Sequence, residues 1–119
     1  MARILLAEDD DSLRQFLAIA LRKVGHEVEA VRDGEEALEA FGDTPFDLLL
    51  ADIVMPGIDG IELARRATEK RPALRVMFIT GFAAVAMSRR NPTRHNTRLL
   101  SKPFHLKDLV DQVEKLLAS

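Results

Sequence analysis

The sequence predicts an α/β domain built on a doubly wound, five-stranded parallel sheet with helices on both faces. Five short apolar runs alternate strictly with five amphipathic stretches along the 119 residues, a pattern typical of parallel sheets covered by helices. The runs are apolar throughout instead of alternating with period two, which indicates strands buried on both faces. With right-handed crossovers in a chain of one domain's length, the expected strand order is 2-1-3-4-5.

Each expected strand is a short apolar run that leads into polar residues. In chain order the runs are Ile4–Ala7, Val28–Val31, Phe46–Ala51, Arg75–Thr80 and Leu99–Leu100.

The expected helices show apolar residues at helical spacing, with capping residues or breakers at several ends. They are Leu13–Val24, closed by Gly25; a helix capped by Asp33 that carries Ala37, Leu38 and Phe41 and is followed by Gly42; a helix from Asp59 to about Arg71, stopped by Pro72; a short helix over Ala83–Ser88; and Leu106–Leu117.

Composition excludes several classes of protein. The chain has no cysteine, which excludes disulfides, thiolate catalysis and zinc–thiolate sites. No apolar run is long enough to span a bilayer, and the first one meets acidic residues too soon for a signal peptide. We therefore expect a cytoplasmic protein without a membrane partner. A formal net charge of -2 argues against a nucleic-acid partner.

The residues that follow the expected strands carry the candidate chemistry. Glu8–Asp11 follow the first strand, Asp52 the third, and Lys102 the fifth, while Thr80 ends the fourth. Ligands bind at this edge of such sheets. Several carboxylates that converge there need a compensating charge, and Mg²⁺ prefers such oxygen ligands. A carboxylate nucleophile, a cation, an ammonium and a hydroxyl are the groups that phosphoryl transfer to an aspartate requires.

Each of these residues has an ordinary structural interpretation on its own. Asp10 or Asp11 could cap the first helix, and Ser12 with Gln15 fits a capping box. Asp52 is typical of a turn, and Lys102–Pro103 of a loop. Their joint occurrence at four strand ends favours the functional interpretation.

The same residues resemble the receiver domains of bacterial two-component response regulators. The segments that carry the resemblance are 4–10, 50–60, 78–81 and 101–104. It implies the flavodoxin-like, CheY-like fold, a single receiver domain over residues 1–119 without an output domain, and a signalling protein rather than an enzyme. It also implies that a histidine kinase or a histidine phosphotransfer protein is the phosphoryl donor.

The resemblance assigns a role to each site residue. Asp52 is the implied phosphoryl acceptor, and Thr80 and Lys102 are expected to bind phosphoryl oxygens. The Lys102–Pro103 bond is expected to be cis. The implied Mg²⁺ ligands are Glu8, Asp9, Asp52 and the backbone carbonyl of Val54.

A narrower resemblance links segments 52–67, 77–86 and 99–110 to stand-alone alphaproteobacterial receivers that act in the cell cycle. It implies that the unphosphorylated form controls proteolysis by ClpXP. A generic single-domain receiver that acts on another partner is the alternative.

The chain departs from the receiver pattern near the site. Many receivers carry an aromatic residue three positions before the lysine, where this chain has Leu99. We therefore expect Phe82, Phe104 or the backbone after Thr80 to change conformation on phosphorylation. Pro103, with its expected cis bond, belongs to the same switch region. Val54 and Phe82 are apolar and cannot orient water, which predicts slow dephosphorylation.

A basic stretch and three histidines complete the set of candidates. Arg89, Arg90, Arg94 and Arg98 form either a solvated loop or a docking face for an acidic partner. His105 is either a surface residue or part of that partner face, and His26 and His95 have the pattern of ordinary loop residues.

Two other functions fit the sequence less well. An aspartyl-nucleophile phosphohydrolase usually needs a second acid two residues after the nucleophile, where this chain has Val54. A pseudo-receiver that serves as a constitutive scaffold would have lost Asp52 or Lys102, and both are present.

Overall fold

The sheet has the predicted order and direction. The computed structural model describes residues 1–81 and 97–118, and all strand pairs in it are parallel, in the order β2-β1-β3-β4-β5. The expected short helix over Ala83–Ser88 lies outside the described residues. The elements are β1 (Arg3–Ala7), α1 (Asp11–Lys23), β2 (Glu27–Val31), α2 (Gly34–Phe41), β3 (Leu48–Asp52), α3 (Gly60–Lys70), β4 (Arg75–Thr80), β5 (Thr97–Ser101) and α5 (Leu106–Ala118).

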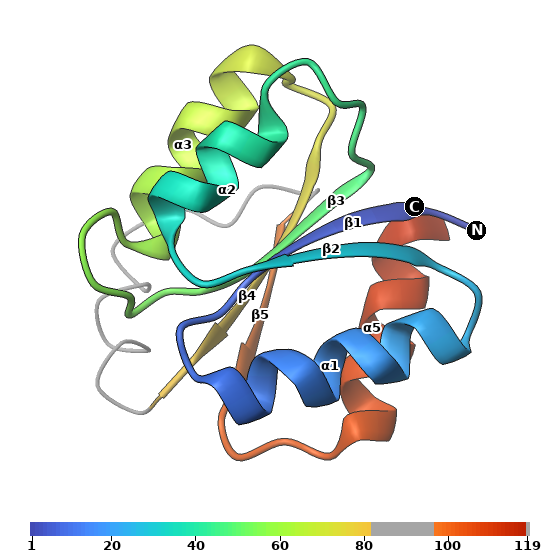
Figure 1. Ribbon diagram of the computed structural model, residues 1–119. Coiled ribbons are helices and arrows are strands. Elements are labelled where there is room, and N and C mark those ends of the chain that lie inside the picture. Colours follow the sequence, from blue (N-terminus) through green and yellow to red (C-terminus); the bar gives the residue numbers. More distant parts are fainter. Residues whose placement is uncertain (82–96, 119) are drawn as a thin grey trace.

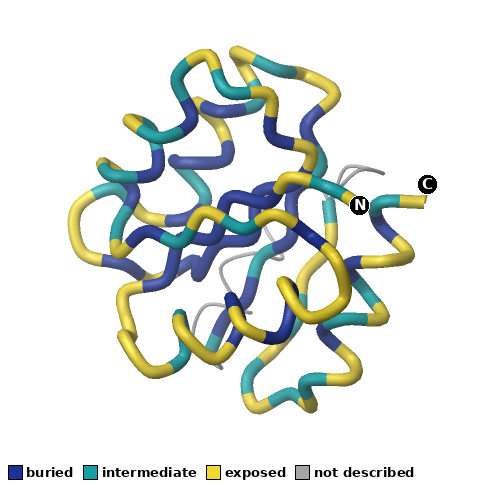
Figure 2. The backbone as a smooth tube through the Cα atoms, turned by 45° about the vertical axis from the view of Figure 1, so that its right-hand side comes forward, coloured by how far each residue is buried: buried dark blue, intermediate teal, exposed yellow. Residues whose placement is uncertain are grey.

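The described helices cover both faces of the sheet. Helices α1 and α5 lie on one face, and α2 and α3 lie on the other (Figure 1). Alternate β1 residues therefore enter different cores: Ile4 and Leu6 pack with α1 and α5, while Leu5 packs with α2 and α3. Burial on both faces explains why the inner strands β1 and β3 are apolar almost throughout. The edge strands β2 and β5 are partly exposed and carry polar residues, so the expectation that every strand is buried on both faces is wrong for these two. Figure 2 shows the buried inner strands between helices whose outer sides are exposed.

The strand register brings four strand ends to one edge of the sheet. Ala7 of β1 pairs with Ala51 of β3, so Glu8 and Asp52 each follow a paired residue. Thr80, the last residue of β4, pairs with Ser101 at the end of β5. The residues predicted to carry chemistry are therefore neighbours because the strands are parallel and in register.

Several element boundaries differ from the predictions by one or more residues, the largest differences being at α1, β3 and β5. Helix α1 begins at Asp11, so Asp10 is its cap and accepts a 2.9 Å hydrogen bond from Leu13 N. The expected Ser12–Gln15 capping box is wrong, because Ser12 already lies inside the helix. Strand β3 begins at Leu48, and β5 extends beyond the Leu99–Leu100 pair.

Two other helix starts match the predicted caps. Asp33 accepts from Glu36 N and Asp59 from Glu62 N, both at 2.8 Å. These bonds satisfy backbone donors that the first turn of a helix leaves without partners.

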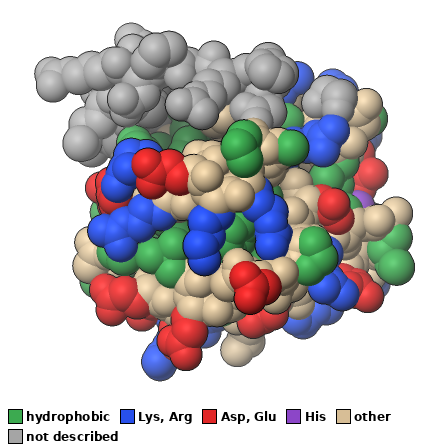
Figure 3. All heavy atoms as spheres, turned by 90° about the horizontal axis from the view of Figure 1, so that it is seen from above, with side chains coloured by type: hydrophobic (Ala, Val, Ile, Leu, Met, Phe, Trp, Pro, Cys, Tyr) green, Lys and Arg blue, Asp and Glu red, His purple; other side chains and the backbone are tan. Residues whose placement is uncertain are grey.

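Charged groups of both signs are interspersed on the side formed by α2 and α3. Figure 3 looks onto this side and shows basic and acidic side chains around an apolar area. On α3, the Glu62 carboxylate accepts hydrogen bonds from Arg65 at 2.6 Å and from Arg66 at 2.8 Å. Among residues 1–81 and 97–118, no helix is long and apolar enough to cross a membrane.

Candidate phosphoryl-acceptor site

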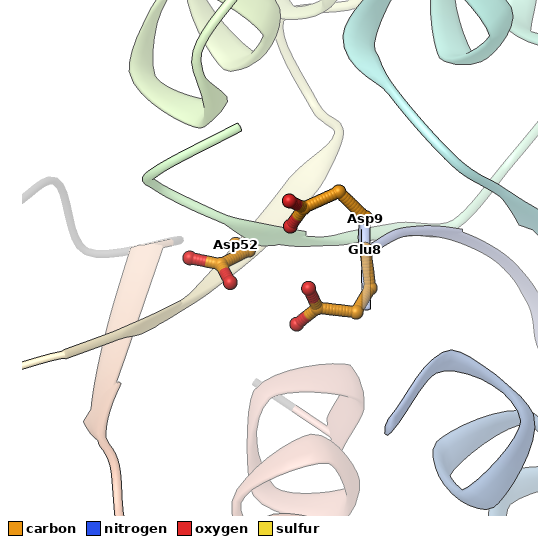
Figure 4. A group of neighbouring side chains, drawn as sticks. All are labelled: Glu8, Asp9 and Asp52. Carbon is orange, nitrogen blue, oxygen red and sulfur yellow. The ribbon is translucent and has the colours of Figure 1, made fainter. Parts of the chain in front are cut away.

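Three carboxylates meet at the carboxyl ends of β1 and β3. Oxygen atoms of Glu8, Asp9 and Asp52 all lie within 4.8 Å of one another, and Figure 4 shows the side chains converging from the two strand ends. Glu8 and Asp52 are buried, whereas Asp9 is exposed. This group would hold a cation with two buried ligands and one that faces solvent.

The backbone around Glu8 fixes its carboxylate. Glu8 N donates to Val31 O at 3.1 Å, and its carbonyl accepts from Arg14 Nη1 at 3.0 Å. Oε2 accepts from Asp10 N at 3.1 Å. Oε1 is buried and has no hydrogen-bond partner among the described residues, although Lys102 Nζ lies 3.5 Å away in an ion pair.

The electrostatics of Glu8 favour a bound cation. Burial raises its pKa to about 7, and the negative charge of Asp52 adds to that rise, while the Asp10 N–H and the Lys102 ammonium oppose it. A buried oxygen without a hydrogen bond, close to two other carboxylates, is a suitable ligand for a small hard cation such as Mg²⁺. The residues present therefore fit the metal that the sequence predicts.

Asp52 lies between a backbone donor and an ammonium. Its Oδ1 accepts from Val54 N at 3.0 Å, and its Oδ2 accepts from Lys102 Nζ at 2.7 Å. Burial lowers the pKa of Lys102, but the hydrogen bond that Lys102 donates to Asp52 and the charges of Glu8 and Asp52 outweigh burial, so the net pKa is raised. Lys102 therefore stays charged and compensates part of the negative charge of the cluster.

A glycine allows helix α3 to begin directly against the strand that carries Asp52. Gly60 N donates to Ile53 O at 2.8 Å. A Cβ on residue 60 would overlap the carbonyl oxygen of Asp52 and lie 2.9 Å from Ile53 Cα. The close approach of the two backbones therefore requires glycine.

Thr80 and the start of the β5–α5 loop complete the edge. Thr80 is fully buried, and its hydroxyl donates to Gly81 O at 3.1 Å. Lys102 N donates to Thr80 O at 2.6 Å, which fixes the backbone of the lysine to β4. The Lys102–Pro103 bond is cis, as the resemblance implies.

The other predicted residues lie around this centre. Val54 is 64% exposed beside Asp52, and Leu99 is 40% exposed on β5. Phe104 packs against the core under α1 and α5. Pro103, Arg98 and His105 are exposed. Phe82, Arg89, Arg90, Arg94 and His95 lie outside the described residues.

Sequence reasoning missed two residues. Gly60 follows the capping Asp59, and no local pattern marks it, because its need for glycine comes from the close approach of α3 to the end of β3. His26 has the pattern of a loop residue, yet it is buried and both ring nitrogens have partners. Nothing in the local sequence indicates that burial, because one of its partners lies in α5.

The comparisons with known proteins agree with this geometry. A profile of the family described as "Response regulator receiver domain" matches residues 4–114. The chain belongs to the response regulator receiver domain family. Receiver domains are signalling modules, and the strand order and the edge of clustered acids described above are the features by which this chain fits the family.

Three relatives cover almost the whole receiver. The response regulator receiver protein CpdR of Brucella abortus (strain 2308) is 56% identical over 117 residues, 98% of each chain. The receiver domain of the hybrid histidine kinase CckA is 36% identical, with a TM-score of 0.81 over 97% of this chain and 98% of that one. The response regulator TrrA of Thermotoga maritima, solved in complex with Mg²⁺–BeF, is 32% identical, with a TM-score of 0.83 over 98% and 99%.

Proposed function

We propose that this protein is a stand-alone response regulator that accepts a phosphoryl group on Asp52. The observation that carries the proposal is the position of the Asp52 carboxylate, with Lys102 Nζ 2.7 Å from Oδ2 and the acids Glu8 and Asp9 beside it. One carboxylate oxygen attacks the phosphorus of a phosphohistidine, the P–N bond breaks, and an acyl phosphate forms on Asp52.

The surrounding residues have separate roles in this proposal. Glu8, Asp9, Asp52 and the Val54 carbonyl would hold Mg²⁺, which supplies positive charge to the transferring phosphoryl group. Lys102 supplies a second positive charge, and Thr80 a hydroxyl for a phosphoryl oxygen. The chain thereby assists its own phosphorylation and dephosphorylation and turns over no other substrate. We propose a cytoplasmic protein that signals by phosphorylation-dependent protein binding.

The similarity to CpdR and to the CckA receiver supports a narrower proposal. The donor would be a histidine kinase or the phosphotransfer protein that such a hybrid kinase serves. The unphosphorylated form would control ClpXP-dependent proteolysis in the cell cycle, as the sequence resemblance implies. The 56% identity to CpdR over 98% of each chain supports this output over that of a generic receiver with another partner.

The acceptor is tested by intact mass spectrometry after incubation with Mg²⁺ and a small-molecule phosphodonor. We expect a gain of one phosphoryl group in the wild-type chain and none in Asp52→Ala. No gain from either the small donor or a phosphorylated histidine phosphotransfer protein would overturn the proposal and favour a pseudo-receiver. Turnover of a generic phosphate ester would favour a phosphohydrolase.

The output is tested separately with purified ClpXP and a substrate whose degradation needs a CpdR-type protein. We expect degradation with the unphosphorylated chain and much less with the phosphorylated one. Equal rates without the chain and with either form would reject the protease role and leave a receiver with another partner.

A further inference from the structure

His26 joins two distant parts of the chain at the edge of the sheet opposite the carboxylate cluster. The residue precedes β2, and its side chain is 5% exposed. Nδ1 lies 3.1 Å from the backbone nitrogen of Ala2, and Nε2 lies 2.6 Å from Oε1 of Glu114 in α5. The imidazole therefore connects the start of β1 to the last helix, and Figures 1 and 2 show the N-terminus beside the C-terminal end of α5.

The two partners permit only one neutral form of the ring. A backbone N–H can only donate, so Nδ1 must carry a lone pair, and a carboxylate accepts, so Nε2 must carry the hydrogen. Protonation places a hydrogen on both nitrogens. Nδ1–H would then face the N–H of Ala2, and that hydrogen bond would be lost, while the contact with Glu114 would become an ion pair.

A hollow of about 360 Å³ beside the ring gives solvent access. The charged groups that line it are Glu114 of α5, Asp47 before β3, Arg75 of β4 and the terminus at Met1. Asp47 Oδ2 accepts from Arg3 N at 2.8 Å, and the Arg3 guanidinium pairs with Glu27 at 3.0 Å. From α1, Arg22 donates to Val28 O at 2.7 Å. Glu114 is therefore the carboxylate that bonds the ring.

We propose that His26 is a proton-sensitive latch between the N-terminal end of β1 and helix α5. The neutral ring is hydrogen-bonded both to the backbone N–H of Ala2 and to the Glu114 carboxylate. The protonated ring keeps Glu114 and releases Ala2, so the attachment of the first strand to the last helix depends on pH. The latch lies at the end of the sheet away from Asp52 and is a property of the fold that does not need phosphorylation.

The test is a pH titration of the full chain, labelled with ¹⁵N and followed by NMR of the imidazole nitrogens and the backbone amides. At neutral pH we expect the Nε2–H tautomer for His26. On acidification the amide of Ala2, which donates to His26 Nδ1 at 3.1 Å, should lose its hydrogen-bonded shift with the midpoint of the His26 ring. The exposed ring of His105 serves as an internal control, and a change at that ring should leave the Ala2 amide unmoved. An Nδ1–H tautomer, or an Ala2 amide that does not follow the His26 ring, overturns the proposal.

Two non-titrating variants separate the two bonds. His26→Asn retains an acceptor near the position of Nδ1, and His26→Gln retains a donor near the position of Nε2. The pH-dependent shift of the Ala2 amide should disappear in both variants, and its persistence would contradict the latch. The tautomer measurement on the wild-type chain decides the question even if a variant fails to fold.

Discussion

Lys102 Nζ donates a 2.7 Å hydrogen bond to Oδ2 of Asp52, 50 residues earlier in the chain. The bond joins the loop after an edge strand to the end of the central strand β3. The acceptor of this bond is the carboxylate that we propose as the nucleophile. The Lys102 ammonium therefore already lies where negative charge develops during phosphoryl transfer. Lys102 also pairs with Glu8 at 3.5 Å, and one cation therefore compensates two buried acids.

Removing the lysine charge should slow phosphorylation. In Lys102→Met the stem is retained and the ammonium is lost, so we expect the phosphorylation rate with a small-molecule donor to fall on the order of 10²-fold, as for other lost charge-stabilising donors. The rate is measured by quenched time courses and intact mass. An unchanged rate in a variant that still binds Mg²⁺ would assign the lysine to stability alone.

The metal-free protein should lose stability as pH rises past the pKa of Glu8. Its pKa in the folded chain is about 7, above the ordinary 4.5, so folding favours the protonated form. The associated stability is present below pH 4.5 and is lost as pH rises through about 7. In Glu8→Gln the charge is absent, and we expect its metal-free Tm at pH 8 to exceed that of the wild-type chain by roughly 5 °C, the shift that about 1 kcal/mol produces in a domain of this size.

Added Mg²⁺ should have the opposite effect on the relative Tm of the wild-type chain and Glu8→Gln. Mg²⁺ should raise the Tm of the wild-type chain and have little effect on Glu8→Gln. A metal-free Tm at pH 8 that is lower in Glu8→Gln than in the wild-type chain would show that the buried carboxylate is stabilising without metal.

Two adjacent acids should have different effects on Mg²⁺ binding. Asp9 lies in the carboxylate cluster, so Asp9→Asn should weaken Mg²⁺ binding on the order of 10-fold or more, since carboxylate charge sets the affinity of such sites. Asp10 instead caps α1, and Asp10→Asn retains both the cap and the affinity. Calorimetric titration of Mg²⁺ into both variants measures the difference, and equal losses would contradict the assignment.

A methyl group at Gly60 should disturb the acceptor. In Gly60→Ala the Cβ would overlap the carbonyl oxygen of Asp52, so α3 or the end of β3 must move. We expect a stability loss of about 1–3 kcal/mol, the usual cost of overpacking, and slower phosphorylation. Asp59→Asn, which changes the adjacent residue but keeps the cap, is the control for urea unfolding. Wild-type stability and rate in Gly60→Ala would show that the loop adapts without cost.

A polar side chain at Val54 should shorten the lifetime of the phosphorylated form. Val54 is 64% exposed, and its backbone N donates to Asp52 Oδ1, so its side chain lies next to the acceptor but cannot bond an attacking water. We expect the acyl phosphate on Asp52 to hydrolyse several-fold faster in Val54→Asn than in the wild-type chain. Hydrolysis is measured as loss of the phosphorylated mass over time. An equal half-life would place control of hydrolysis elsewhere.

Local patterns in the sequence were enough to predict the sheet, its order and the residues at its carboxyl edge. Apolar runs that end in Glu8, Asp52 or Thr80 identify strand ends, and parallel strands bring their ends to one edge for simple geometric reasons. The caps at Asp33 and Asp59 were equally predictable, because a capping side chain bonds a backbone N–H only three residues away.

Only the tertiary structure decided the features that depend on contacts between distant segments. The raised pKa of Glu8 arises from burial beneath residues that its own sequence neighbourhood does not reveal. The requirement for glycine at position 60 depends on how closely α3 approaches β3. His26 has the sequence of a loop residue, and its partner Glu114 lies 88 residues away. Periodicity and capping are properties of neighbouring residues, whereas burial and bonding at these three positions depend on how the elements pack.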